Sequence, residues 1–404
     1  MKCNSKYSGW LICALTSGVL FCSIYSDNLC ANSFKKFLNH HKLDFGGWIH
    51  GGATLNPSQS GGFNGPVIFA DQANKFQLNQ FNLFMRRSVV SEGKTWDFGG
   101  RFDFMFGTDA IFTQAFGVPT FDVNDGTPLK RSEWDLNLCC ASTRTYGIAL
   151  PQAFFEAYIP IGNGLNVKLG HFYTPTGFET VPAPDNFFYT RAYTLNVGEP
   201  FTHTGMLATY QANANWQILG GPLTGSATGG WDAGWDRQLS NWSGLGGFTW
   251  TSDNQATSFH LSGTYGETSA RSSEIWGFYN IVFKHRITPK TLLVLQDVYK
   301  RQMYNIVFQH KIDPKTLLVL HHVHGYAGNP STVTATPADY YNATLGLNWK
   351  AAKTLKLTWN ALKKLTIRPN IRYDRVDAYH TTAYRPFGGN KDQILFSLDF
   401  LLPF

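Results

Sequence analysis

The chain has little charge, few cysteines and no long apolar run beyond its N-terminal region. Only 15% of its 404 residues are charged, whereas 15% are aromatic, and apolar residues are interleaved with polar ones along most of the chain. A helix that crosses a bilayer needs about 18 or more mostly apolar residues, so a helical membrane protein is excluded. The aromatic content is too high for a disordered chain, which leaves two soluble domains or one large all-β unit.

The first 26 residues have the pattern of a secretory signal peptide. Lys2 and Lys6 precede an apolar, uncharged stretch at residues 10–25 that is too short for a membrane anchor. We expect cleavage between residues 26 and 31, which leaves a single domain at residues 32–404. Four of the six cysteines lie in this removable region, and the other two are adjacent in sequence, so no disulfide framework is expected.

Apolar and polar residues then alternate with a period of two, which is typical of strands with one apolar face. The clearest examples are residues 96–106, 341–349, 365–374 and 394–404. These segments span about 9 to 12 residues, the length that a tilted strand needs to cross a bilayer, whereas strands of soluble proteins most often have about 5 to 6. Their opposite faces carry Arg, Asp, Asn and Thr, which are costly in the core of a soluble β-sandwich but are hydrated in a barrel lumen. The sequence therefore predicts an all-β fold, a transmembrane antiparallel β-barrel of about 14 to 16 strands.

Two segments are nearly identical. Residues 279–296 and 304–321 differ at only four of eighteen positions, and they are joined through residues 297–302, whose sequence is DVYKRQ. One DNA sequence that encodes this hexapeptide is the transposase mosaic end used to prepare sequencing libraries. We therefore interpret residues 279–303 as a duplicated segment created when two overlapping reads were joined. A genuine duplication of one hairpin is the alternative.

Four blocks of sequence carry a more specific resemblance. They read GGFNGPVIFADQANKFQLNQFNLFMRR (61–87), GGRFDFMFGTDAIFTQAFG (99–117), LGHFYTPTGFETVPAPDNFFYTRAYTLNVGEPFTHTGMLATY (169–210) and LTIRPNIRYDRVDA (365–378). On these blocks the chain resembles the OmpL-like outer-membrane beta-barrel porin family of Gram-negative bacteria over nearly its whole mature length. The resemblance implies a bacterial outer-membrane barrel with a porin-like role, and only the duplicated segment departs from the pattern.

A proline-rich segment at residues 173–201 interrupts the strand pattern and predicts a long loop. Long ordered loops of barrels often fold inward and narrow the pore, and the alternative is a loop that only covers the rim. The candidate constriction residues are Glu179, Asp185, Arg191 and Glu199. The candidate pore-lining residues, taken from the polar faces of two strands, are Arg101, Asp103, Arg368, Arg372 and Asp374. Internal ion pairs that brace the wall are the alternative for these five.

No other group of residues in the sequence strongly indicates a metal, cofactor or catalytic site. The loop at residues 107–147 contains several carboxylates, including Asp109, but lacks the spacing of an EF-hand. His322 and His324 share one face of a strand, but no third metal ligand can be identified. No nucleophile elbow, zinc-binding helix or phosphate-binding loop is present. We therefore expect no enzyme activity, no metal and no cofactor.

The expected function is passive diffusion of small hydrophilic solutes, and the alternatives are a closed barrel that acts as an adhesin or structural protein and, third, an outer-membrane hydrolase. The expected partners are outer-membrane lipid, the barrel-assembly machinery through the C-terminal strand ending at Phe404, and sister subunits in a homotrimer. The formal charge of +7 falls to about +1 without the signal peptide and residues 279–303. No nucleic-acid partner is therefore expected.

Overall fold

A computed structural model describes residues 28–59, 61–90, 93–110, 145–224, 242–268, 274–299, 303–313, 316–327, 338–350, 360–378 and 384–404. The predicted signal peptide lies outside these ranges, so its cleavage stays a prediction. No helix among the described residues is long and apolar enough to cross a membrane.

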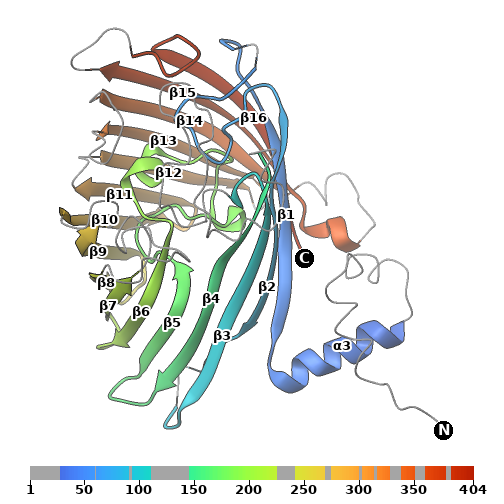
Figure 1. Ribbon diagram of the computed structural model, residues 1–404, viewed down its shortest axis with the longest axis vertical. Coiled ribbons are helices and arrows are strands. Elements are labelled where there is room, and N and C mark those ends of the chain that lie inside the picture. Colours follow the sequence, from blue (N-terminus) through green and yellow to red (C-terminus); the bar gives the residue numbers. More distant parts are fainter. Residues whose placement is uncertain are drawn as a thin grey trace.

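Sixteen strands in the described part of the chain form one closed antiparallel barrel (Figure 1). Each strand pairs with its neighbours in sequence, and β1 pairs with β16 to close the sheet. The all-β barrel predicted from the alternation is therefore confirmed, at the upper end of the expected strand number. The strands are β1 (Asp44–Leu55), β2 (Phe76–Arg87), β3 (Asp97–Gly107), β4 (Gly147–Ile159), β5 (Leu165–Tyr173), β6 (Thr202–Gln211), β7 (Trp216–Thr224), β8 (Trp242–Thr251), β9 (Thr257–Thr268), β10 (Glu274–Thr288), β11 (Thr291–Tyr299), β12 (Met303–Asp313), β13 (Thr316–Ala327), β14 (Ala338–Lys350), β15 (Thr366–Ala378) and β16 (Asp392–Pro403).

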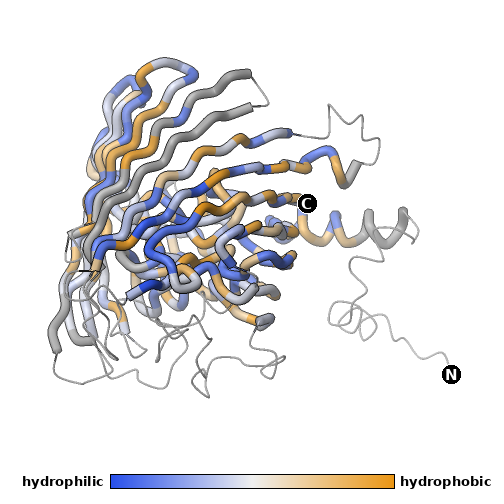
Figure 2. Tube along the Cα trace, turned by 90° about the horizontal axis from the view of Figure 1, so that it is seen from above, coloured by the Kyte–Doolittle hydropathy of each residue, from blue (hydrophilic) through white to orange (hydrophobic). Residues whose placement is uncertain are grey.

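The alternation of the sequence becomes an outer and an inner face of the barrel wall. In β16, Phe396 and Leu398 are exposed on the outside, whereas Ser397 and Asp399 are buried on the inside. Apolar and polar positions accordingly alternate along the strands in Figure 2. An apolar exterior and a polar interior are the inverse of a soluble protein, and they place the exterior in lipid.

The two near-identical segments form two consecutive hairpins with the same register. Phe283 pairs with Leu295 in the β10–β11 hairpin, and the equivalent Phe308 pairs with Leu320 in the β12–β13 hairpin. Both hairpins also shift register at equivalent positions before their turns. Each copy is therefore one complete hairpin unit of the wall.

The two ends of the barrel differ in the length of their connections. The three longest connections, residues 56–75, 108–146 and 174–201, each join an odd-numbered strand to the next even one and so leave from the same end. Long loops mark the extracellular end of outer-membrane barrels, and short turns mark the periplasmic end. The start of β1 and the C-terminal Phe404 therefore lie at the periplasmic end.

A helix precedes the barrel at this periplasmic end. Helix α3 (Asn28–His41) ends where Lys42 takes a positive φ of 53°. The N–H of Leu43 donates to the carbonyl of Leu38, and the N–H of Lys42 donates to that of Asn39, which is the pattern of a Schellman motif. The motif turns the chain sharply from α3 into β1.

Candidate functional site in the barrel lumen

Residues 174–201, here called the inserted segment, fold from the β5–β6 connection into the barrel. They contain two short helical turns, Ala183–Asp185 (η1) and Thr194–Gly198 (η2). The prolines of this segment cannot donate to a strand ladder, which explains why the chain leaves the wall here. The predicted long loop is thus observed, and it lies inside the lumen rather than over the rim.

Strand β2 holds the first part of the inserted segment. The Gln80 side chain donates to the carbonyl of Val181 at 2.9 Å and accepts the N–H of Ala183 at 3.0 Å. The same Gln80 oxygen accepts the indole N–H of Trp48 at 2.8 Å, and the hydroxyl of Tyr189 donates to Asn79 at 2.8 Å. All of these side chains are buried.

Strand β15 holds the inserted segment from another part of the wall through Arg368. Its guanidinium donates to the carbonyls of Ala183 at 3.1 Å and Asn186 at 2.8 Å. It also contacts Asp399 at 2.5 Å, and Asp399 lies 2.8 Å from the His50 ring nitrogen. Because Arg368 and Asp399 are almost fully buried, this pair anchors the segment and does not face the open lumen.

A second arginine of β15 makes a similar anchor. Arg372 forms an ion pair with Asp374 at 2.7 Å and donates to the carbonyl of Arg191 at 2.5 Å. Its guanidinium also lies 4.9 Å from the centre of the Tyr193 ring. Both members of the pair are fully buried under the inserted segment.

Arg191 organises the interior of the segment itself. It donates to the carbonyls of Thr180 at 3.1 Å, Phe188 at 2.7 Å and Tyr189 at 3.0 Å. Burial lowers the pKa of Arg191 to about 10, and the nearby Glu179 opposes this shift. Burial also raises the pKa of Glu179, which accepts the N–H of Ala192 at 2.7 Å. Arg191 therefore remains charged at neutral pH and joins the backbone at Thr180 to the backbone at Phe188 and Tyr189.

Glu199 ties the end of the inserted segment to the duplicated region of the wall. Its carboxyl accepts hydrogen bonds from Asn280 in β10 at 2.7 Å and from Gln296 in β11. Burial raises the pKa of Glu199 to about 8, and the nearby Glu179 adds to the shift. The carboxyl is therefore mostly neutral at pH 7 and contributes little charge to the lumen.

Asp185 differs from the other three candidate constriction residues because it is exposed to the lumen. Burial of part of its carboxyl raises the pKa of Asp185, and the positive charges of Arg101 and Arg191 oppose this. Arg101 is itself partly exposed and holds Asp103 at 2.6 Å through its Nε. Asp185 and Arg101 are therefore accessible groups of opposite charge in the lumen.

A second extracellular connection also folds inward, which sequence reasoning missed. In residues 56–75, Ile68 and Phe69 pack with Val181, Leu195 and Phe201 of the inserted segment in one buried apolar cluster. The signal was present as the apolar run VIFA at residues 67–70, in a region otherwise rich in Gly and Asn. An apolar run in a loop predicts burial against another loop, because such a run is not stable in water.

The carboxylate-containing loop at residues 107–147 lies only partly within the described residues. Asp109 is buried and accepts hydrogen bonds from Asn79 at 2.9 Å and Gln80 at 2.8 Å, and burial raises its pKa to about 7. Residues 111–144 of the same loop lie outside the described ranges. No group of three potential metal ligands occurs in the part of the chain that the structure describes.

Sequence reasoning also missed the wall residues that receive the inserted segment. His50, Gln80 and Asp399 all lie on the inner faces of their strands. The period-two alternation places them inward, but it does not show which inward residue meets a loop. That information depends on contacts between residues more than 100 positions apart, such as Gln80 with Val181.

Solved structures with the same fold include outer-membrane channels. Pseudomonas putida OprB is 13% identical with a TM-score of 0.60, and the match covers 92% of this chain and 97% of OprB. The outer membrane channel DcaP of Acinetobacter baumannii is 11% identical with a TM-score of 0.51, and the match covers 90% of this chain and 97% of DcaP. At these identities the likeness shows the shared barrel fold.

Sequence comparison gives the family. A search of curated protein sequences finds no significant match. The model of the family described as "putative beta-barrel porin-2, OmpL-like" matches residues 42–302, which is more than half of the chain. The three sequence blocks at 61–87, 99–117 and 169–210 lie within this match, whereas the block at 365–378 lies outside it. The family resemblance is therefore confirmed: the chain belongs to the OmpL-like beta-barrel porin family, and it is a porin of the bacterial outer membrane.

Proposed function

We propose that the protein lets small hydrophilic solutes diffuse passively through the part of the lumen that the inserted segment leaves open. The observation that carries the proposal is the attachment of this segment to the wall by Arg368 and Arg372. A loop fixed by buried charge-assisted hydrogen bonds sets a constant constriction, whereas a mobile rim loop does not. Solutes then move down their own gradients without a cofactor.

The candidate residues take different roles in this proposal. Arg101 and Asp185 contact the passing solute, because both are accessible from the lumen. The remaining candidates are buried, and they determine the shape of the constriction without contacting the solute. They are Asp103, Glu179, Arg191, Glu199, Arg368, Arg372 and Asp374. Charge selectivity therefore depends on few side chains, although the lumen contains many.

A closed barrel is the second candidate, and one observation favours it. Apolar side chains of two inward-folded loops form a shared cluster around Phe69 and Phe201, which fills part of the lumen near its extracellular end. If this cluster and the constriction together leave no aqueous path, the barrel serves as an adhesin or a structural protein. The family and fold are those of a channel rather than an enzyme, and a hydrolase has no site motif to support it.

The proposed partners follow from the same fold. The lipid-facing exterior contacts the outer membrane along all strands. We propose that the assembly machinery recognises β16 together with Phe404, which directly follows it and exchanges two backbone hydrogen bonds with Gly47. A homotrimer and a signal peptide at residues 1–26 are also part of the proposal.

Swelling of liposomes in sugars of graded size tests the proposal. We expect rapid swelling with a monosaccharide, slower swelling with a disaccharide and none with a large oligosaccharide, because the inserted segment narrows the lumen. Liposomes with the same lipid but no protein are the control. Absence of swelling with every sugar, from a barrel shown to be folded, would replace the porin function by the closed barrel.

A further inference from the structure

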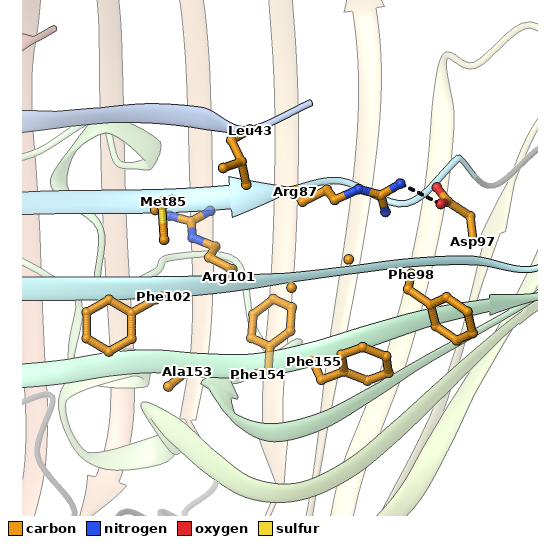
Figure 3. A pocket seen from close by; sticks show the side chains of 12 residues that line it. Leu43, Met85, Arg87, Asp97, Phe98, Arg101, Phe102, Ala153, Phe154 and Phe155 are labelled. Atoms are coloured by element: carbon orange, nitrogen blue, oxygen red, sulfur yellow. Dashed lines mark hydrogen bonds and ion pairs between the residues drawn. The ribbon is translucent and has the colours of Figure 1, made fainter. Parts of the chain in front are cut away.

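The outer wall of the barrel has a hollow near its periplasmic end (Figure 3). It is a shallow, open depression of about 630 Å³ that extends over β2, β3 and β4, next to the start of β1. Its walls include Phe98, Phe102 and Phe155, which are exposed on the lipid-facing side. In Figure 3 the rings of Phe98, Phe102 and Phe155 flank β3 and β4, with Met85 and Leu43 nearby.

Small residues in two adjacent rows create the hollow. Gly100 stands between Arg87 and Phe155 in one row across the sheet, and Ala153 pairs with Phe102 in the next row. A Cβ atom on Gly100 would lie 2.6 Å from the carbonyl oxygen of Phe154. The backbone therefore excludes a side chain here, and the space remains open to whatever covers the wall.

The position of the hollow places it in the periplasmic leaflet of the membrane. Trp96, which directly precedes β3, is exposed, and tryptophans of this kind mark the membrane–water interface. Gly100 lies four residues further along the strand, roughly 13 Å at about 3.3 Å per residue. The hollow thus extends from the membrane–water interface into the acyl-chain region of this leaflet.

Helix α3 continues the same surface. The ring of Phe34 in α3 contacts the ring of Phe45 in β1 edge to face, with centroids 5.8 Å apart. Phe45 pairs with Met85 of β2, and Met85 lines the hollow. Figure 1 shows α3 outside the barrel wall, beside the start of β1. The helix therefore lies at the lipid boundary, next to the hollow.

Among the described residues, the charges around this surface leave a surplus of positive charge. The two aspartates nearest to it are paired, Asp44 with Arg86 at 3.0 Å and Asp97 with Arg87 at 2.7 Å. Lys35 and Lys36 of α3 and the adjacent Lys42 are exposed, and the structure records no ion pair for them within the described ranges. With Phe34 and Phe37 also exposed, α3 has the composition of a basic interfacial helix.

We propose that this surface binds one anionic phospholipid of the periplasmic leaflet, with an acyl chain in the hollow and the headgroup beside the lysines of α3 and Lys42. Acyl chains match the aromatic walls of the hollow, and an anionic headgroup matches the unpaired positive charge. The depression offers an acyl chain contacts with the side chains of Phe98, Phe102 and Phe155 at the same time. The proposal depends on the outer-membrane location and not on whether the barrel conducts.

Native mass spectrometry of the full chain in detergent, with added lipid, tests the proposal. The probes are dioleoyl phosphatidylglycerol and dioleoyl phosphatidylcholine, which share acyl chains and differ in headgroup charge. We expect one phosphatidylglycerol to be retained at least about fivefold better than phosphatidylcholine, as one lysine near an anionic surface contributes roughly that factor.

Two variants separate the chain site from the headgroup site. Ala153→Leu fills the hollow from a lipid-facing position, and we expect it to weaken retention of both lipids. The triple variant Lys35→Gln, Lys36→Gln and Lys42→Gln should remove the preference for phosphatidylglycerol and keep the residual binding of phosphatidylcholine. Ala343→Leu makes the same change at an exposed position of β14 and should leave retention unchanged.

Each variant is first shown to be a folded barrel by its heat-dependent mobility in gel electrophoresis. Equal retention of the two lipids by the wild type would overturn the charged headgroup site. Unchanged retention in Ala153→Leu, or an equal loss in Ala343→Leu, would show ordinary annular lipid and overturn the hollow as a site. A conductance result, in either direction, would not alter these outcomes.

Discussion

Exposure divides the charged residues of the lumen into two groups. Arg368 and Arg372 are fully covered by the inserted segment, and their charges are balanced by Asp399 and Asp374. Asp185 is instead accessible. A charge that is buried and paired contributes little field to a passing ion, whereas an accessible charge acts directly. Ion preference should therefore respond to the accessible charges, Asp185 and Arg101, and not to the buried pairs.

The substitution Asp185→Asn tests this distinction. We expect the reversal potential under a KCl gradient to shift towards anions, because Asn removes negative charge beside Arg101 and keeps the side-chain size. Glu199→Gln, measured at pH 6, is the matched control and should produce no shift, because Glu199 is already neutral there. The same reversal potential in wild type and Asp185→Asn would remove Asp185 from the ion path.

Glu199 gives the constriction a pH dependence. The pKa of its carboxyl is about 8 in the folded protein against an ordinary value of 4.5. The folded state therefore binds a proton more tightly than the open state, so docking of the segment weakens as pH rises from about 4.5 to about 8 and is weakest above that. We expect hydrogen exchange at residues 194–199 to accelerate more over this range in wild type than in Glu199→Gln.

Other loop carboxyls with raised pKa values, including those of Glu179 and Asp185, also contribute to the pH dependence measured in that experiment. Burial raises the pKa of Asp71 to about 6 and that of Asp109 to about 7, so both titrate in the same window. Glu199→Gln should accordingly reduce the pH dependence without abolishing it. Identical exchange profiles for wild type and variant would show that Glu199 does not control docking.

At the scale of elements, the inserted segment is held by its contacts with β2, β10, β11 and β15. Arg368 is the strongest single anchor, because one guanidinium joins Asp399 and two carbonyls of the segment. Removing one partner of a buried ion pair typically costs about 3 to 5 kcal/mol, whereas exposed pairs contribute about 0 to 1 kcal/mol. This free-energy cost would weaken the docking of the inserted segment and leave the strand pairing of the barrel wall unaffected.

We predict that Arg368→Met raises the single-channel conductance and its noise, because the segment undocks from β15. Arg375→Met is the matched control on the same strand, since Arg375 pairs with Asp377 on the exposed surface. Planar-bilayer recordings provide the measurement. A conductance in Arg368→Met equal to that of the control would show that the anchor does not define the pore.

The second prediction at the scale of elements concerns deletion of one copy of the duplicated hairpin. Deletion of residues 279–303 joins the first part of β10 to the second copy and leaves an even number of strands, so the wall can still close. We expect the deleted chain to form a heat-resistant barrel that inserts into liposomes.

A deletion variant that fails to fold, beside a folded full-length chain, would show that both hairpins are needed. Amplification across the junction from source DNA addresses the origin of the repeat separately. A product that carries both copies would contradict the interpretation of residues 279–303 as an artefact.

At the scale of the whole molecule, the barrel could be predicted from the alternation of apolar and polar residues. This pattern within each strand shows which side chains face outward and which face inward. Asp399 and Phe396 already indicate inside and outside from their positions in sequence. The interior of the lumen could not be predicted in the same way. The contacts of Gln80 with Val181 and of Arg368 with Asn186 join distant segments, and no local pattern specifies them.

The lumen also contains an apolar interior that the composition does not reveal. Phe69 and Phe201 come from different extracellular connections and meet inside a barrel whose inner wall is mostly polar. The wall therefore folds as a membrane protein, while the loops inside it pack like a small soluble core. The space between the inner wall and these packed loops determines the width of the remaining aqueous path.

The most direct test of a porin narrowed by a fixed inserted segment is the single-channel conductance of the wild-type barrel in a planar bilayer. We predict discrete, stable current steps, smaller than those expected for an unobstructed sixteen-stranded barrel, that follow the bulk conductivity of the salt solution. Absence of steps from a folded and inserted barrel would contradict an open channel. Steps as large as those of an unobstructed barrel would contradict the constriction.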